Sequence, residues 1–221
     1  MIKALIFDFD GLILETEGPV FQSWLELFQS YDFSLTISDW AIFIGTTDVD
    51  PFDLLEQRLG RRLDRSEIER PRAQREAEII AHQPIQPGVL DYLQSAQRLG
   101  LKIGLASSSP CSWVTGHLTR LGLLGYFDCL LARDDVQRGK PDPELYLTVL
   151  KSLNVTADQA IALEDSPNGI LAARGAGIFC VAVPNDMTRQ LPLSHANLII
   201  DSLAATSLEE LLRIPEQQNP I

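Results

Sequence analysis

The chain begins with the stretch Ile2–Gly11, which reads IKALIFDFDG and joins an apolar run to two acids and a glycine. The apolar part predicts a buried β-strand. If the extended geometry continues, the carboxylates of Asp8 and Asp10 point to the same side, and Gly11 lets the chain turn away. Two acids this close repel each other unless a cation or a shared proton is present. Asp8 is therefore a candidate nucleophile and metal ligand, and Asp10 a candidate acid and base, with a solvated turn as the alternative.

The composition is typical of an acidic globular protein. The 221 residues allow one large or two small domains, and hydrophobic residues make up 45% of the chain, enough for a sizeable core. The formal net charge of -12 argues against nucleic acid or an anionic membrane surface as the main partner. It leaves a small phosphorylated substrate possible, because a metal ion and a few local cations can reverse the field inside one cleft.

The cysteines, histidines and apolar segments indicate where the protein works. Three cysteines without Cys-x-x-Cys spacing suggest reduced thiols, and three isolated histidines argue against a zinc site. We expect neither a membrane span nor a signal peptide, because the apolar segments are too short. The expectation is a cytoplasmic protein, without a membrane or nucleic-acid partner and with a monomer as the favoured state.

Short apolar runs recur along the chain and are separated by helical patterns. The runs are Ile2–Phe7, Leu101–Ala106, Phe127–Leu131, Ala160–Leu163 and Ile178–Val183. Strands that alternate with helices predict an α/β fold, here a Rossmann-like parallel sheet core with helices on both faces. Binding sites in such sheets lie beyond the carboxyl ends of the strands, where Asp8, Ser107 and Glu164–Asp165 fall.

A long insertion between the first two strands has a helical pattern. The residues with the spacing of one buried helix face are Phe21, Trp24, Leu25 and Phe28. Further along, Ser66 followed by Glu69 matches a capping box. We expect an inserted all-α cap domain at residues 16–83 and a core domain formed by residues 1–15 and 84–221. A helical layer fixed to the sheet is the alternative.

Three predicted helix starts share one pattern, in which a capping residue precedes a proline. They are Ser109–Pro110, Asp142–Pro143 and Ser166–Pro167. The fixed backbone angle of proline suits the first helical position. Two of these starts follow directly on strand ends, so their free N–H groups would face one crevice and suit an anion. Taken singly, each of these starts is an ordinary helix N-terminus and needs no functional explanation.

The turn after the second strand supplies candidates for phosphate binding. Ser107 and Ser108 can offer hydroxyl and backbone N–H groups to an oxyanion, and we include Gly11, at the end of the first strand, with them. The alternative is a polar turn between a strand and a helix.

Lys140, Glu164 and Asp165 carry the remaining charge of the candidate site. Pro141 biases Lys140 toward an extended conformation just before a helix, where its ammonium group could neutralise a phosphate and the crowded carboxylates. Glu164 and Asp165 form a second acidic pair at a strand end, and their oxygen ligands suit Mg²⁺. The alternatives are a surface lysine and acids that stabilise a helix dipole.

Taken in order, these residues resemble the four motifs of the haloacid dehalogenase superfamily. The motif residues are Asp8, Asp10, Gly11, Ser107, Lys140, Glu164 and Asp165. The chain looks most like the β-phosphoglucomutase-like phosphatases, in which a helical cap is inserted after the first motif. The resemblance covers essentially the whole chain.

The resemblance implies a mechanism. Asp8 would attack phosphorus and form an aspartyl phosphate, while Asp10 would protonate the leaving oxygen and later deprotonate the attacking water. Mg²⁺ would be held by Asp8, the backbone carbonyl of Asp10, Asp165 and, directly or through water, Glu164. The equatorial oxygens of the transferring group would be stabilised by Ser107 and Lys140.

Two departures from the family pattern bear on function. Glu15 replaces the usual aspartate in the hinge segment, which concerns hinge geometry more than chemistry. The mutases of the subgroup carry a histidine where this chain has Val20. They also carry a basic residue in a cap loop that corresponds to residues 43–48, and this loop contains no basic residue here. A mutase must retain a bisphosphate, so these departures favour a phosphatase.

Three functions follow from these residues. The first is a Mg²⁺-dependent phosphatase that acts on a small phosphorylated metabolite, a sugar or nucleoside monophosphate. The second is an isomerase, a β-phosphoglucomutase that uses the same intermediate, and the third is a phospho-accepting signalling module. Selectivity is expected in the cap, where the candidates Trp24, Phe43 and Thr46 could equally pack against one another.

Overall fold

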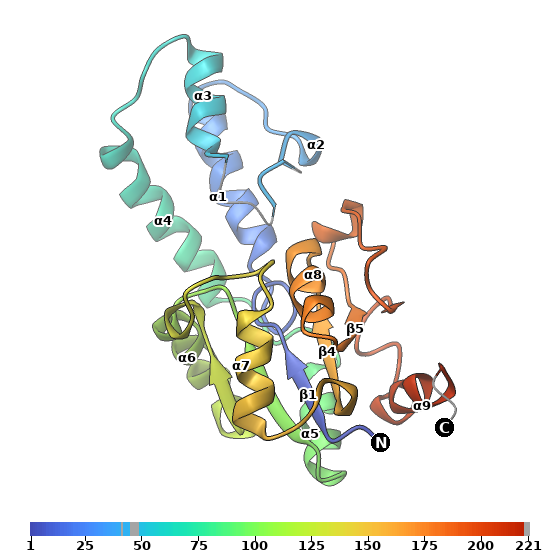
Figure 1. Cartoon of the computed structure of the whole chain (residues 1–221). Helices are drawn as coiled ribbons and strands as arrows, with labels where there is room; N and C mark the ends of the chain where they lie inside the picture. The colour runs from blue at the N-terminus through green and yellow to red at the C-terminus, as the bar shows by residue number, and fades with distance from the viewer. Residues whose placement is uncertain (41, 45–48, 219–221) are drawn as a thin grey trace.

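A six-stranded parallel sheet forms the centre of the larger, lower part of the molecule (Figure 1). The computed structural model describes residues 1–40, 42–44 and 49–218. The strands are β1 (Ala4–Phe7), β2 (Lys102–Ala106), β3 (Cys129–Leu131), β4 (Ala160–Glu164), β5 (Phe179–Ala182) and β6 (Leu198–Ile199), in the order β3-β2-β1-β4-β5-β6. This confirms the predicted parallel sheet. Sequence reasoning missed β6, because two residues are too short for a recognisable apolar run.

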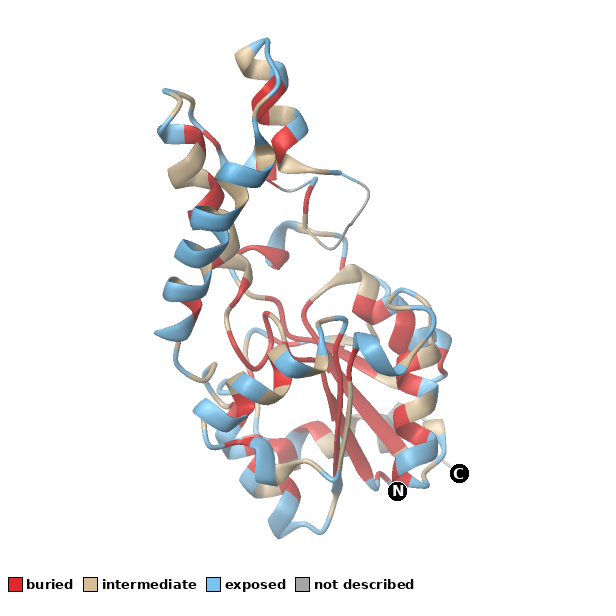
Figure 2. Cartoon of the chain, turned by 90° about the vertical axis from the view of Figure 1, so that its left-hand side faces the viewer, coloured by how far each residue is buried: buried red, intermediate tan, exposed pale blue. Residues whose placement is uncertain are grey.

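Helices cover both faces of this sheet. They are α5 (Val89–Arg98), α6 (Cys111–Arg120), α7 (Glu144–Leu153), α8 (Pro167–Gly175) and α9 (Leu208–Gln218). Leu5 and Phe7 of β1 belong to one apolar cluster with α5, α6 and α9, whereas Ala4 and Ile6 belong to a second cluster with α7 and α8. Alternate residues of a strand point to opposite faces, so burial on both sides explains the continuous apolar run of β1. Figure 2 shows the strands buried almost throughout.

A second group of helices lies beyond the carboxyl ends of the strands (Figure 1). It consists of α1 (Glu17–Gln29), α2 (Ile37–Trp40), α3 (Pro51–Leu59) and α4 (Arg65–Ala81). These helices pack around their own apolar cluster, which includes Trp24 and Phe28, as the helical spacing predicted. The arrangement is consistent with an inserted helical cap. The domain boundaries at residues 16–83, 1–15 and 84–221 stay a prediction.

Short 3₁₀ turns connect the helices and strands of the part that contains the sheet, at Leu124–Tyr126, Arg133–Asp135, Ala157–Gln159 and Thr188–Gln190.

Within the described part of the chain, no helix has the length and apolar character needed to cross a membrane.

Several predicted helix starts were wrong by one or two residues. The capping box at Ser66 and Glu69 does not form, because α4 begins at Arg65 and the carboxylate of Asp64 accepts hydrogen bonds from the N–H groups of Ser66 and Glu67. An aspartate two residues earlier already satisfies the free donors.

The three proline starts differ from one another. The start at Ser166–Pro167 is confirmed, since the Ser166 hydroxyl accepts from the N–H of Gly169. Helices α6 and α7 instead begin one residue later than predicted, after Pro110 and Pro143, although the Asp142 carboxylate still accepts from the N–H of Glu144, as a capping residue does.

Candidate active site

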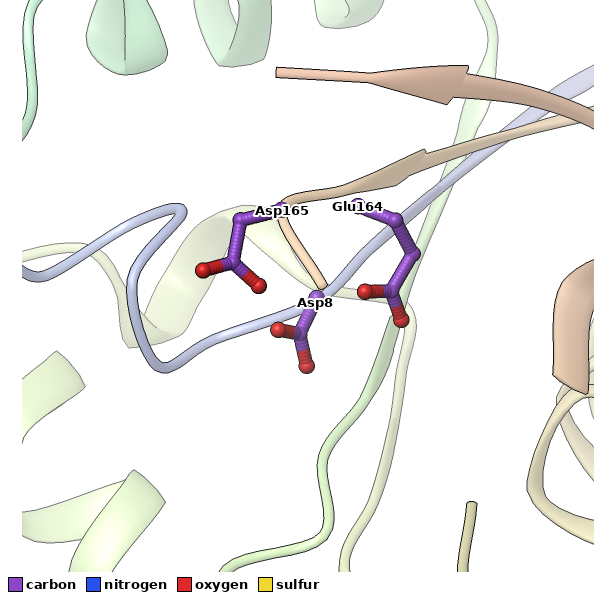
Figure 3. A group of neighbouring side chains, drawn as sticks. All are labelled: Asp8, Glu164 and Asp165. Atoms are coloured by element: carbon purple, nitrogen blue, oxygen red, sulfur yellow. The ribbon is translucent and has the colours of Figure 1, made fainter. Parts of the chain in front are cut away.

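Three buried carboxylates meet at the carboxyl ends of β1 and β4 (Figure 3). Asp8 directly follows β1, Glu164 ends β4, and Asp165 comes next. The two strands are neighbours, with Phe7 opposite Leu163, and this register brings their ends together. One oxygen of each carboxylate lies within 4.8 Å of the others. The fold therefore brings together acids that are more than 150 positions apart in the sequence.

Lys140 pairs two of these acids. Its Nζ donates to Oδ1 of Asp8 and to Oε1 of Glu164, both at 2.6 Å, and its side chain is 5% exposed. Tyr146 of α7 donates its hydroxyl to the same Glu164 oxygen at 2.6 Å. The Nζ atom also lies 5.4 Å from the centre of the Tyr146 ring, within reach of a cation–π contact. Lys140 is thus held against Asp8 from several sides.

Burial dominates the electrostatics of this cluster. It raises the pKa of Asp8 and Asp165 above the ordinary range and that of Glu164 to about 7, and the charges of neighbouring carboxylates act in the same direction. Lys140 opposes these shifts. Burial alone would lower the pKa of Lys140, but Asp8 and Glu164 raise it above its usual value, so the ammonium group stays charged.

The donor set fits a divalent cation. Three carboxylates face one ammonium group, which leaves excess negative charge in a buried place. Carboxylate oxygens are the ligands that Mg²⁺ prefers, and a second cation would favour the charged forms of these acids. The carboxylates that would hold it are those of Asp8, Glu164 and Asp165, and the backbone carbonyl of Asp10 stays a predicted further ligand.

Gly11 and Asn185 determine the position of Asp165. The backbone of Gly11 has φ +78°, and a Cβ there would lie 2.1 Å from Oδ2 of Asp165. Only glycine combines that conformation with so close an approach. Asn185 donates from Nδ2 to the same Asp165 oxygen at 2.9 Å and to the Gly11 carbonyl at 3.3 Å. The close approach of Asp165 therefore explains why residue 11 is glycine, without any contact between Gly11 and a phosphate.

Hydroxyl and indole groups from the neighbouring strand end surround Asp10. Ser109 donates its hydroxyl to Oδ2 of Asp10 at 2.6 Å, and the Trp113 indole Nε1–H donates to Oδ1 at 3.0 Å. Ser107 is fully buried, lies 3.4 Å from the same Oδ2 atom and accepts from the N–H of Ser109. Two side chains of the turn after β2 and one from the first turn of α6 therefore converge on one carboxylate.

A cavity of about 860 Å³ opens between the core and the cap helices. Its core side includes Asp8, Asp10, Ser108, Ser109, Trp113, Lys140 and Asp165. Its cap side includes Thr16, Glu17, Val20, Trp40, Phe43, Ile44, Glu76 and Ile80. The floor is charged, whereas the cap side combines apolar and aromatic groups with two acids.

The predicted residues divide between this cavity and its support. Ser108 lines the cavity and is exposed, whereas Ser107 and Gly11 are buried and are not among the described lining residues. Phe43 lines it, Trp24 lies in the apolar cluster of the cap helices, and Thr46 falls outside the described residues. Phosphate contact by Ser107, Ser108 and Gly11 stays a prediction.

Sequence reasoning missed five residues. They are Glu17, Ser109, Trp113, Tyr146 and Asn185. Asn185 follows the end of β5 and could have been found by the strand-end rule that found the acids. Ser109 and Trp113 also follow a strand end, that of β2, with Ser109 just before α6 and Trp113 in the first turn of that helix. No comparable signal marks Tyr146, which lies within an ordinary amphipathic helix.

The model of the haloacid dehalogenase-like hydrolase family matches residues 5–183. The chain belongs to this family. It is 44% identical over 220 residues to YhcW of Bacillus subtilis, covering 99% of this chain and all of that protein. It is 33% identical to a phosphorylated carbohydrates phosphatase of Thermotoga maritima, covering 96% and 98% of the two chains. The crystal structure of a β-phosphoglucomutase from Clostridium difficile matches with a TM-score of 0.76, 25% identity and 99% of each chain.

These matches confirm the resemblance stated from the motifs, including the β-phosphoglucomutase-like subgroup. The prediction of an enzyme that hydrolyses phosphoric monoesters is likewise confirmed. Membership of a hydrolase family also favours an enzyme over a signalling module.

Proposed function

We propose that this hydrolase is a Mg²⁺-dependent phosphatase that removes phosphate from a small hydroxylated metabolite through an aspartyl phosphate on Asp8. One observation carries the proposal. The Asp8 carboxylate lies on the cavity floor, bonded to Lys140 and within 4.8 Å of Glu164 and Asp165. A nucleophile, a charge-neutralising ammonium group and a metal-ligand set thus occupy one buried place.

Asp8 and Asp10 divide the chemistry between them. An oxygen of Asp8 forms a bond to phosphorus while the ester bond breaks, and Asp10 gives a proton to the leaving oxygen. In the second half, Asp10 takes a proton from water as the water oxygen displaces Asp8 from phosphorus. The ammonium group of Lys140 stabilises the developing negative charge and keeps Asp8 oriented. A bound Mg²⁺ would neutralise charge on the phosphate and on the carboxylates.

The first test is a panel of phosphomonoesters, including sugar and nucleoside monophosphates, with inorganic phosphate as the readout. We expect activity with Mg²⁺, loss to background after chelation with EDTA, and recovery on adding Mg²⁺ in excess. Chelation should leave the circular dichroism spectrum unchanged, because the fold has its own apolar core. Full activity in EDTA would refute the metal-dependent proposal, and inactivity toward the whole panel would refute the phosphatase.

The cavity favours hydrolysis over the mutase reaction. Lys140 is the one basic side chain among the described residues that line it, and this lysine is already bonded to Asp8 and Glu164. A bisphosphate that turns around would need a second cationic site. Conversion of β-glucose 1-phosphate to glucose 6-phosphate, stimulated by the bisphosphate, would decide for the mutase instead.

Glu17 is placed to recognise the part of the substrate that is not phosphate. It lies in the first turn of α1 and lines the cap side of the cavity near Trp40 and Phe43. Burial raises its pKa to about 7, and the nearby carboxylates Asp10 and Glu15 add to the shift. The Glu17 carboxyl group can accept hydrogen bonds from hydroxyls in either protonation state, and in its charged form it repels a second phosphate. This side of the cavity therefore suits a neutral polyhydroxy group.

Replacing Glu17 by leucine should lower kcat/KM for glycerol 3-phosphate by up to about tenfold, the scale of one hydrogen bond. Propyl phosphate has the same kind of leaving group without the hydroxyls, so its kcat/KM should change little. Glu17→Gln keeps an acceptor of similar size and should retain most of the activity. Equal losses on both substrates would show that Glu17 does not contact the hydroxyls.

The raised pKa of Glu17 also predicts how the stability of the protein depends on pH. The folded protein holds this proton more tightly than the unfolded chain, so the wild type loses stability as pH rises from about 4.5 to about 7. Glu17→Gln has no such proton, and its melting temperature relative to the wild type should therefore be higher at pH 8 than at pH 5.

A further inference from the structure

The carboxylate of Asp10, which follows β1, is hydrogen-bonded by side chains that follow a different strand, β2. Its Oδ2 atom accepts from Ser109 at 2.6 Å, and its Oδ1 atom accepts from the indole Nε1–H of Trp113 at 3.0 Å. Both partners come from the segment that leads from β2 into α6. Hydrogen bonds on the two oxygens together fix the rotation of the carboxyl plane, which a single bond would leave free.

The indole of Trp113 is itself fixed. Trp113 is half-buried near the start of α6 and lines the cavity. One helical turn further on, the imidazole of His117 packs against it, with the ring centres 4.4 Å apart and the planes at 70°. His117 also lies 6.3 Å from the ring of Phe9, the residue between the two candidate acids. The indole of Trp113 therefore packs against an aromatic neighbour that itself contacts the strand end of the candidate acids.

The partners of the two Asp10 oxygens differ chemically, since Oδ2 faces the hydroxyls of Ser109 and Ser107 and Oδ1 faces the indole of Trp113. A serine hydroxyl can donate or accept a hydrogen bond, whereas an indole N–H can only donate. Oδ1, which faces Trp113, is therefore kept as an acceptor in both protonation states of Asp10. When Asp10 acts as the acid, its proton is therefore on Oδ2, beside the adaptable hydroxyls of Ser109 and Ser107.

We propose that Trp113 is a positioning residue for proton transfer, one that orients Asp10 and assigns the mobile proton to Oδ2. This inference rests on the proposed phosphatase function. In the first half-reaction the proton passes from Oδ2 to the leaving oxygen as the ester bond breaks and the bond from Asp8 to phosphorus forms. In the second half, Oδ2 takes a proton from the attacking water as the bond to Asp8 breaks. Without the indole N–H, the carboxyl group can rotate away from the leaving oxygen.

The test compares two leaving groups in the Trp113→Phe variant, which keeps an aromatic ring but lacks the N–H. p-Nitrophenolate leaves readily without a proton, whereas the leaving group of phenyl phosphate is more basic and gains more from one. We expect kcat/KM to fall by about tenfold for phenyl phosphate and by less than about threefold for p-nitrophenyl phosphate, because a misplaced acid affects only the proton-dependent part of the barrier.

Trp24→Phe makes the same chemical change in a tryptophan that lies in the apolar cluster of the cap helices. It should affect both substrates by the same factor, whatever that factor is. Equal losses on the two substrates in Trp113→Phe, or no loss on either, would overturn the positioning role. A wild-type protein that cleaves neither ester would count against the phosphatase itself.

A second measurement tests the contact without any turnover. In a ¹H–¹⁵N spectrum, the indole resonance that disappears in Trp113→Phe belongs to Trp113. We expect this resonance to shift in Asp10→Ala while the indole resonances of Trp24 and Trp40 remain in place. If the Trp113 resonance does not move, the hydrogen bond to Asp10 is absent and the inference fails.

Discussion

Asp8→Asn should lower phosphate release by roughly 10⁴-fold or more, the scale on which removal of an enzyme nucleophile acts. The amide nitrogen and oxygen of asparagine cannot form the acyl phosphate. The side chain keeps its size, and its oxygen can still accept from Lys140, which donates to Asp8 at 2.6 Å. The fold should therefore survive, because the apolar cores are untouched. The measurement is phosphate release under saturating Mg²⁺, with mass spectrometry of acid-quenched protein to detect the phosphoryl adduct.

Asp158→Asn is the matched control. Asp158 is exposed and lies just before β4, at the opposite end of that strand from Glu164. It should retain full activity and the adduct. An active Asp8→Asn protein, or an adduct that persists in it, would transfer the nucleophilic role to another group.

Lys140→Met should be the most destabilising single change in the site. It removes the cation between Asp8 and Glu164 and leaves both carboxylates buried without their partner. Breaking a buried ion pair in this way costs about 3–5 kcal/mol. Activity should fall as well, by roughly 10²–10³-fold, the usual effect of losing one group that stabilises transition-state charge. Urea unfolding and the rate of phosphate release measure the two effects.

The loss of stability should depend on pH. Lys140 lowers the pKa of Asp8 and Glu164 against the effect of burial. Without it, both pKa values rise further, and the folded protein binds these protons more tightly than the unfolded chain. The stability of the variant therefore falls more steeply with rising pH than that of the wild type. The loss of unfolding free energy relative to the wild type should be larger at pH 8 than at pH 5.5. Lys151→Met, an exposed lysine of α7, should show neither effect. An equal loss at both pH values would show that charge burial is not the cause.

Much of the fold could be predicted from local pattern. The apolar runs indicated five of the six strands, because a parallel sheet buried on both faces needs continuous apolar segments. Residues that directly follow such runs necessarily lie at one edge of the sheet, which is why Asp8, Ser107 and Glu164–Asp165 could be grouped in advance. Helix starts were less predictable, since Asp64 and Ser66 are both capping residue types, and in the structure Ser66 donates its N–H and its hydroxyl to the Asp64 carboxylate.

The partners of the site residues could not be predicted in this way. Tyr146 donates to Glu164 from 18 positions away, and Trp113 donates to Asp10 across 103 positions. Neither residue type is unusual in its helix. Their orientation toward the site depends on how α6 and α7 pack on opposite faces of the sheet, which involves many apolar contacts at once.

The sequence by itself determined the charged groups of the site and the strand ends that carry them, because β-strand periodicity and chain order are local properties. Only the tertiary structure decided which side chains are hydrogen-bonded to each other. Lys140 donates to Asp8, Asn185 donates to Asp165, and Trp113 donates to Asp10. It also decided what faces the candidate site, since the cap side of the cavity is formed by helices that meet the core only after folding. Hydrogen bonds select their partners by distance and direction, and these are set by packing rather than by sequence spacing.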